Sequence, residues 1–469
     1  MAKLWKKLPP PMADNFGFIE VLNKTDGMGI IDDCSEYRTS AERRRRHREN
    51  GEAQMRVVHT EIGPEDVVSG TRQKVLDAFE DGRRDLTPEF VLLSAGPCSA
   101  MIGTDLEEIA ETIGQSSGIK AAAVKLSGHK AYDTGISETL LAMAKLLTKP
   151  GNICPGSVNI LGVTALDWQE ENAGALRGWL ESQDFSAAMH TTKTSGERFL
   201  VAMHTTKTSG EGFLVAMHTT KTSSGRFLVT ADFGGAERAE NIARAAEAQV
   251  NLVVTVSGLA AAKYLKSRYG TPYIAAAPFG KSWTERVLEA LESGRQPEQG
   301  TAGQKPESGG RSGEPECGRR VTEQEPECSR RVAEQEPECS MQAENMEPEV
   351  LIICEQFMGN AIRETLLCDY GMENVRVYTF YMMEKSLEQP GDGRLRSEQE
   401  AEKLLKEGGF HTIIADPLLR CFAPEGSRWI DLPHRAFQLY GEHPALPLFF
   451  GEHLNKWLDE QLRKTEENI

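Results

Sequence analysis

Two of the nine cysteines stand where a thiol could do chemistry. Cys98 lies in SAGPCSAMIG, directly after an apolar run and at the expected start of a helix. A thiol in the first turn of a helix meets the positive end of the helix dipole and unpaired N–H groups, which favour the thiolate. Cys34 ends a glycine-containing segment, DGMGIIDDC, that we interpret as a turn. Iron–sulfur ligands and reactive cysteines are thiolates, so both residues are candidates, although spacing alone leaves two unrelated free thiols an equal alternative.

The other seven cysteines have simpler explanations. Cys317, Cys328 and Cys339 are copies within an 11-residue repeat. Cys354 and Cys368 fall in apolar strand or helix patterns typical of a core. Cys154 and Cys421 lack a partner at metal-ligand spacing.

A phosphate-binding loop is the next motif to consider. The segment AAAPFGKS, which ends in Gly280, Lys281 and Ser282, follows an expected strand and precedes an expected helix. Ala275, however, replaces the first glycine of a P-loop, whose conformational freedom lets the backbone wrap the phosphates. The sequence contains no GxGxxG after an expected strand. Nucleotide hydrolysis at this loop is therefore a minor alternative.

Composition narrows the class of protein. The 469 residues carry 53 Lys+Arg against 70 Asp+Glu, a formal net charge of -17, and 39% hydrophobic residues. An acidic chain argues against nucleic acid or an anionic membrane as the main partner. No apolar run reaches the roughly 18 residues that a transmembrane helix needs, and the first residues lack the apolar core of a secretory signal. We expect a cytoplasmic protein whose thiols stay reduced or bind metal.

Two tandem repeats interrupt the chain. Residues 188–229 hold three near-identical 14-residue units, and residues 295–348 form a Pro/Glu/Gly-rich stretch that contains the 11-residue repeats. The first array separates an amphipathic helix pattern from a short apolar strand pattern, so we predict a surface insertion at a helix–strand connection. The second has too few apolar residues for a core, and we predict a disordered linker.

The remaining sequence alternates apolar strand patterns with amphipathic helix patterns. Such alternation is typical of α/β proteins with parallel sheets covered on both faces, which bind ligands at the carboxyl ends of the strands. We predict two to three Rossmann-like parallel-sheet units. The expected organisation is an N-terminal segment and first unit over 1–165, a second unit over 166–294, the linker over 295–348 and a third unit over 349–469.

Several segments, in order, carry a family resemblance. Residues 60–79 contain Val67, Val68 and Gly70, GPCSAMIGTDLEEIA contains Cys98, and SVNILG at 157–162 reads as the strand that ends a first domain. A long second-domain segment then ends in a Gly-x-Pro turn and AAAPFG. With these features the chain resembles the nitrogenase component 1 type oxidoreductases.

The resemblance implies a set of cofactors and partners. Cys98 matches a cysteine that ligates the cluster at the subunit interface, and Cys34 matches another more loosely. Two thiolates per chain imply a [4Fe–4S] cluster shared between two subunits, in a homodimer or with a related component 1 subunit. Electrons would come from an iron-protein-like ATPase. His434 resembles the histidine ligand of the cofactor, and Lys130 or Tyr132 would line a pocket.

The resemblance also implies limits on the function. The cysteine that anchors the iron–molybdenum cofactor has no counterpart near 250–258, so neither that cofactor nor dinitrogen reduction is expected. The leading hypothesis is a reductase of an unidentified small-molecule or cofactor substrate. The alternatives are a metallocluster assembly scaffold or carrier without turnover, and a cluster-free small-molecule-binding protein. No nucleic acid or membrane partner is expected.

Overall fold

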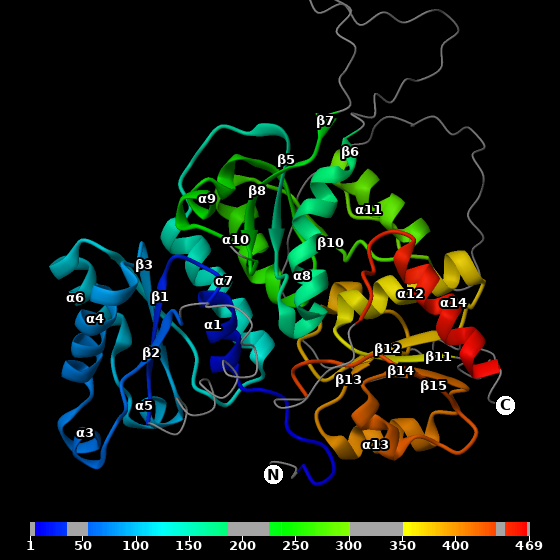
Figure 1. Ribbon diagram of the computed structural model, residues 1–469, viewed down its shortest axis with the longest axis horizontal. Helices are drawn as coiled ribbons and strands as arrows, with labels where there is room; N and C mark the ends of the chain where they lie inside the picture. The colour runs from blue at the N-terminus through cyan, green and yellow to red at the C-terminus, as the bar shows by residue number, and fades with distance from the viewer. Residues whose placement is uncertain are drawn as a thin grey trace, which may run out of the picture.

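A computed structural model describes residues 5–34, 55–185, 225–235, 237–300, 350–437 and 446–466. Its strands form three parallel sheets, each flanked by helices, and a short two-stranded ladder (Figure 1). The predicted α/β class with Rossmann-like parallel-sheet units is therefore confirmed.

The first unit carries a four-stranded parallel sheet in the order β2-β1-β3-β4. Its strands are β1 (Met28–Asp32), β2 (Val57–His59), β3 (Phe90–Ala95) and β4 (Lys120–Val124). Helices α4 (Arg72–Leu86) and α6 (Leu106–Ser117) cover one face, and α1 (Asp14–Leu22) and α7 (Tyr132–Leu147) cover the other (Figure 1). Two short helices, α3 (Pro64–Ser69) and α5 (Pro97–Ile102), follow β2 and β3.

The second unit has the strand order β10-β9-β5-β8. Its strands are β5 (Cys154–Leu161), β8 (Leu228–Phe233), β9 (Ala248–Val253) and β10 (Tyr273–Ala275), and its helices are α8 (Ala165–Ser182), α9 (Ala239–Ala243), α10 (Leu259–Tyr269) and α11 (Lys281–Ser293). We expected residues 157–162 to form the last strand of the first unit. They lie instead in β5, which pairs with β8 and β9, so a boundary at residue 165 would cut the second sheet. The alanine-rich segment 239–247 forms only α9 and one 3-10 turn before β9.

The third unit holds a five-stranded parallel sheet in the order β13-β12-β11-β14-β15. Its strands are β11 (Val350–Ile353), β12 (Val375–Thr379), β13 (Gly393–Arg394), β14 (Thr412–Ala415) and β15 (Arg428–Asp431), and its helices are α12 (Gln356–Tyr370), α13 (Glu398–Glu407) and α14 (His453–Glu466).

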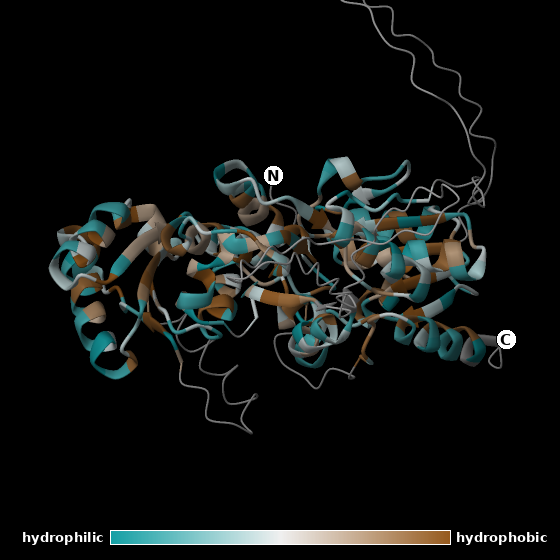
Figure 2. Cartoon of the chain, turned by 90° about the horizontal axis from the view of Figure 1, so that it is seen from above, coloured by the Kyte–Doolittle hydropathy of each residue, from teal (hydrophilic) through white to brown (hydrophobic). Residues whose placement is uncertain are grey.

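The apolar core runs through all three units. One large cluster of buried side chains includes Phe18 of the first unit, Leu252 of the second and Ile352 of the third. A second, smaller cluster lies between the first sheet and helices α4 and α6, around Phe79 and Ile113. Figure 2 shows this pattern as hydrophobic strands inside hydrophilic helix surfaces. The sheets are therefore covered on both faces, as continuous apolar strands require.

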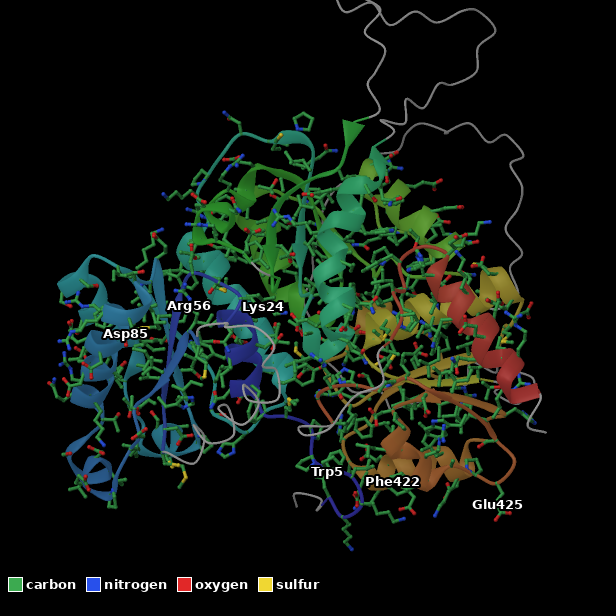
Figure 3. The ribbon with its side chains drawn as sticks, in the orientation of Figure 1. Trp5, Lys24, Arg56, Asp85, Phe422 and Glu425 are labelled. Atoms are coloured by element: carbon green, nitrogen blue, oxygen red, sulfur yellow. The ribbon has the colours of Figure 1, made fainter. Side chains whose placement is uncertain are left out.

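The N-terminal segment and α1 connect the units. The backbone N–H groups of Lys6, Lys7 and Leu8 donate to the carboxylate of Glu398 in the third unit. Lys24, at the end of α1, makes an ion pair of 3.4 Å with Glu170 of α8. Figure 3 shows Lys24 at this junction, and Trp5 near Phe422 at the edge of the third unit.

Both repeat arrays fall mostly outside the described residues, as does the basic run at 41–50. The flanks of the first array are described. Strand β6 (Asp184–Phe185) directly follows α8 and pairs antiparallel with β7 (Gly225–Arg226), just before β8. The array thus leaves and re-enters the fold at one point, between a helix and a strand. None of the helices in the described ranges has an apolar stretch long enough to cross a bilayer.

Candidate functional site

The two cysteines singled out by the sequence come together at the carboxyl ends of β1 and β3. The thiol sulfurs of Cys34 and Cys98 and a carboxylate oxygen of Asp33 all lie within 4.8 Å of one another. Parallel strands β1 and β3 are hydrogen-bonded neighbours, so the loops that follow them open at the same edge of the sheet. The structure therefore joins two residues that are 64 positions apart and adds a carboxylate that the sequence analysis missed.

Cys34 follows a buried strand rather than a turn. Our interpretation of DGMGIIDDC as a turn is wrong, because Met28–Asp32 is a central strand with every residue buried. Gly29 is tolerated there since its missing side chain leaves room for Phe18, whose ring a Cβ would meet at 2.7 Å. The strand gives Cys34 a rigid attachment.

A buried carboxylate fixes the two cysteine-bearing segments to each other. Asp32, the last residue of β1, accepts hydrogen bonds from Thr60 Oγ1 at 2.7 Å, Thr71 Oγ1 at 2.7 Å and Ser99 Oγ at 2.6 Å. Ser99 directly follows Cys98 and Asp32 stands two residues before Cys34. Charge-assisted bonds of this length hold the two cysteine-bearing segments in position.

Asp33 lies against both cysteines. Its Oδ1 accepts from the backbone N–H of Cys34 at 2.8 Å and of Cys98 at 3.2 Å. The carboxylate packs so closely on Gly96 that a Cβ at that position would lie 1.9 Å from Oδ2. Glycine at 96 is therefore required for the Asp33 side chain to occupy this place.

The structure gives Cys98 little of the helix-dipole stabilisation expected from the sequence. Helix α5 has only six residues, and the N–H of Cys98 is engaged by the Asp33 carboxylate. Burial first, and then the adjoining Asp33 carboxylate and Cys34 thiol, raise the pKa of Cys98 to about 12. A bound metal reverses this balance, because a cation stabilises every thiolate that ligates it. Two sulfur donors and one buried carboxylate fit a thiophilic metal group.

Two large apolar side chains are exposed on the short helices that follow β2 and β3. Met101, on the same short helix as Cys98, is 84% exposed, and Val68, on α3, is 90% exposed. The two helices are connected through Thr71 and Thr104, whose hydroxyls are 2.8 Å apart. Isolated exposed apolar side chains are ordinary, but two of them beside an incomplete donor set are suited to contact with another subunit.

His434 lies in a second, central cluster of polar side chains. Its Nε2 is 3.3 Å from the hydroxyl of Tyr132, and its Nδ1 is 3.1 Å from the hydroxyl of Tyr381. The Tyr132 hydroxyl also donates to Asp167 at 2.5 Å. All four side chains are buried, and they come from α7, the segment after β12, α8 and the segment after β15. Two residues named from the sequence, Tyr132 and His434, thus meet across 302 positions, whereas Lys130 is exposed.

The hydrogen bonds fix the tautomer of His434. The N–H of Ala436 donates to Nδ1 at 3.2 Å, so Nδ1 is an acceptor and the ring proton of the neutral imidazole lies on Nε2. That proton faces the Tyr132 hydroxyl, which in turn donates to Asp167. Both ring nitrogens are therefore occupied, and His434 would have to release one of them to ligate a metal.

Further carboxylates surround this centre. Burial, and then the charge of Asp167, raise the pKa of Glu355 to about 8. Burial also raises the pKa of Asp133, which accepts from the N–H of Met382. Side chains fill this centre: the space lined by Cys354, Tyr381 and His434, among others, does not admit a water molecule.

The phosphate-loop candidate is covered by the C-terminal segment. The N–H of Lys281 donates to Asn455 Oδ1 at 2.8 Å, and that of Gly280 to the carbonyl of Phe449 at 3.4 Å. The Ser282 hydroxyl donates to Asp369. The donors that would cradle phosphates already have protein partners, and the geometry does not favour nucleotide binding here.

Comparison with known proteins decides the family. The family model "Nitrogenase component 1 type Oxidoreductase" matches residues 33–394, a span that contains Cys34 and Cys98. The chain belongs to this family. Component 1 proteins bind iron–sulfur clusters and work in multimers with an iron-protein reductase. A search of curated protein sequences finds no match.

Solved structures share the component 1 fold. One, titled "Nitrogenase Cp1 at pH 6.5", matches with a TM-score of 0.60 and 13% identity, over 99% of this chain and 94% of the other. A second, "Nitrogenase Cp1 at pH 5", gives a TM-score of 0.55 and 12% identity, over 99% and 89%. At such identities the likeness extends to the fold alone.

Proposed function

We propose that this component 1 protein is a reductase subunit that holds a [4Fe–4S] cluster through Cys34 and Cys98. The observation that carries the proposal is the convergence of both thiols within 4.8 Å at one edge of the first sheet. When bound, the cluster supplies one-electron transfer at a potential that its burial and hydrogen bonds tune. One chain offers two thiolates, so the cluster is completed by a second subunit, identical or related.

The chain's own residues position and shield the cluster. Asp32 ties Cys34 to Cys98 through the hydroxyls around it, which keeps the two sulfurs at a fixed separation. Met101 on α5 and Val68 on α3 are exposed apolar side chains in the same unit, and a second subunit that covers them would also exclude water from the cluster. Electrons come from an iron-protein-like ATPase. ATP hydrolysis is assigned to that partner because the phosphate-loop candidate of this chain is already occupied by its own C-terminal segment.

The substrate is a small molecule or cofactor reduced at the His434 centre. There, Tyr132, His434 and Asp167 form a connected set of proton-bearing groups between the three units. Reduction needs protons as well as electrons, and a buried imidazole whose Nε2–H faces a tyrosine hydroxyl can hold and pass one. The iron–molybdenum cofactor and dinitrogen reduction are not part of this proposal.

A specific observation also favours the second candidate, a carrier or assembly scaffold without turnover. The space beside His434 does not admit a water molecule, and both ring nitrogens of His434 are engaged. A carrier needs the cysteine site but no substrate site, so a closed centre agrees with it.

One experiment separates these candidates. The anaerobically reconstituted protein is mixed with an iron-protein-like ATPase and dithionite, with ATP or with a non-hydrolysable analogue, and cluster reduction is followed by electron paramagnetic resonance. A reductase shows ATP-dependent reduction of a cluster that stays bound to this chain. Transfer of the iron to an apo-acceptor protein, without ATP-dependent reduction, selects the carrier and contradicts our proposal.

A further inference from the structure

We propose that the N-terminal segment 5–12 is a strap that closes the His434 centre, and that a small-molecule substrate reaches His434 when this strap lifts. The inference rests on the proposed function and adds to it a route into the centre. A route is needed because the space beside His434 does not admit a water molecule. Figure 1 shows the strap, in dark blue, running between the third unit and α1.

The inner end of the strap, Met12, joins two segments of the centre. Its N–H donates to the carbonyl of Ala436 at 3.2 Å, and its carbonyl accepts from the N–H of Tyr132 at 2.8 Å. Ala436 is also the residue whose N–H donates to Nδ1 of His434. The Met12 side chain is buried in the large apolar cluster. Because Met12 is held on both sides, it is suited to be the fixed end about which the strap turns.

The outer end of the strap is held by one carboxylate of the third unit. Glu398 is the first residue of α13. Its carboxylate accepts from the N–H groups of Lys6, Lys7 and Leu8, at 2.7, 2.9 and 3.1 Å. Consecutive amides that converge on one anion form a single attachment, which is made or lost as a whole. The Lys7 ammonium adds an exposed ion pair of 3.3 Å with Glu402.

The strap also supports one wall of the centre from outside. The ring of Trp5 lies 5.8 Å, between centroids, from the ring of Phe380. Phe380 and Phe437, whose ring centroids are 5.2 Å apart, both line the space beside His434. When Trp5 moves away, the Phe380 ring loses this support and can turn outward, which opens the wall.

Three prolines make the strap move as one piece. Residues 9–11 are all proline, a sequence that favours a stiff extended chain and has no N–H to donate. A stiff spacer therefore separates the fixed end at Met12 from the carboxylate attachment. Loss of that attachment frees the outer end without unfolding a helix or strand, since residues 5–12 form none. The buried side chain of Leu8 favours the closed position at rest.

The test uses Cys354, whose thiol is buried and lines the same space, as a probe of access. The full chain, after anaerobic cluster reconstitution, is treated with methyl methanethiosulfonate, and labelling of Cys354 is followed by peptide mass spectrometry. Glu398→Ala releases the outer attachment, and Trp5→Ala removes the support of Phe380. Glu407→Ala is the matched control, because Glu407 lies exposed at the other end of α13.

We expect labelling of Cys354 to be roughly ten- to a hundredfold faster in Glu398→Ala than in the wild type, because the rate follows the population of the open form and the lost hydrogen bonds are charge-assisted. Trp5→Ala should also react faster, and Glu407→Ala should match the wild type. Hydrogen exchange of the third sheet, measured on the same samples, should stay at the wild-type level in all variants.

Wild-type labelling rates in both Glu398→Ala and Trp5→Ala overturn the strap and leave the proposed function standing. Faster labelling that comes with lost protection throughout the third sheet shows unfolding of the unit and also overturns the strap. Failure of the proposed function has a different readout, since it appears as a cluster that the ATPase does not reduce.

Discussion

Three consecutive residues at the end of β1 contribute in different ways to the cysteine site. Asp32, the last residue of β1, points among three hydroxyl groups, whereas Asp33 and Cys34, which follow the strand, both lie against Cys98. One short segment thus ties the two loops together and places a carboxylate and a thiol beside the second cysteine.

Gly96 is the residue whose replacement tests this packing directly. In Gly96→Ala the new methyl group would lie 1.9 Å from Asp33 Oδ2, so the carboxylate must move. We expect a loss of about 1–3 kcal/mol in the free energy of unfolding, measured by urea denaturation of the apo protein, and reduced iron binding. Gly174→Ala is the control, because nothing lies within 4 Å of a Cβ there in helix α8 and the change should stabilise by about 0.5–1 kcal/mol. Equal stability of the two variants would contradict the account.

A second residue-scale prediction concerns pH. Burial, and then the charge of Glu237 opposed by that of Arg177, leave the pKa of Asp232 raised from 3.8 to about 7. The folded protein then binds this proton more tightly than the unfolded chain, so stability falls as pH rises from about 4 to 7 and is level above. A rise of this size corresponds to roughly 4 kcal/mol.

Asp232→Asn removes that titration and preserves an acceptor for the N–H of Gly235. Urea denaturation at several pH values should show the wild type losing stability relative to this variant between pH 4 and 7. Curves that stay parallel across this range would show that Asp232 does not titrate as described.

The individual cysteines could be named from the sequence, but their environment could not. Cys98 follows an apolar run and a Gly-Pro pair, which is a local signal. Asp33 carries no such signal, because its importance comes from Gly96 and Cys98, more than 60 positions away. The apolar residues before the Asp32–Asp33 pair did offer a clue, since polar residues directly after a buried strand mark a ligand-binding edge.

At the scale of elements, the expected strands and helices were mostly correct, and the errors have physical causes. Gly27 and Gly29 led us to interpret the segment of β1 as a turn, whereas the missing side chain of Gly29 leaves room for the ring of Phe18. The alanine-rich segment after β8 has a composition typical of a long helix, but α9 ends at Ala243 and β9 begins at Ala248. Strand pairing is non-local, so nothing in residues 157–162 could reveal which sheet they join.

The first repeat array gives the element-scale prediction. Strands β6 and β7 bring the two ends of the array together. Removing residues 188–215 should therefore leave helix α8, strand β8 and the rest of the second sheet unchanged. Shortening a loop from 39 to 11 residues stabilises a fold by about 1 kcal/mol, from the entropy of loop closure. Thermal unfolding and iron content after reconstitution measure this. An insoluble or iron-free product would show that the array belongs to the fold.

At the scale of the whole molecule, three separately built sheets meet around His434. Tyr132, Asp167 and Tyr381 come from different units, and their contacts span up to 302 positions. A sequence pattern can single out a histidine or a tyrosine, but it cannot predict that their side chains are in contact, because that contact depends on how the sheets pack. The family resemblance predicted the fold, and the comparisons confirm that prediction.

The surface beside the cysteine site predicts assembly with a second subunit. In Met101→Glu or Val68→Glu, a charge on the exposed apolar surface should prevent association of the reconstituted protein, as measured by anaerobic sedimentation. Ile153→Glu is the control, since Ile153 is 64% exposed but belongs to the loop before β5 in the second unit. Unaltered association in both test variants would place the subunit contact elsewhere.

Anaerobic purification of the wild type, Cys34→Ala and Cys98→Ala, with iron and sulfide analysis and electron paramagnetic resonance of the dithionite-reduced protein, tests the central claim most directly. The account predicts close to four irons and four sulfides per cluster in the wild type, with a reduced-cluster signal that either substitution abolishes or alters. A wild type without iron, or two variants that keep the wild-type signal unchanged, would contradict it.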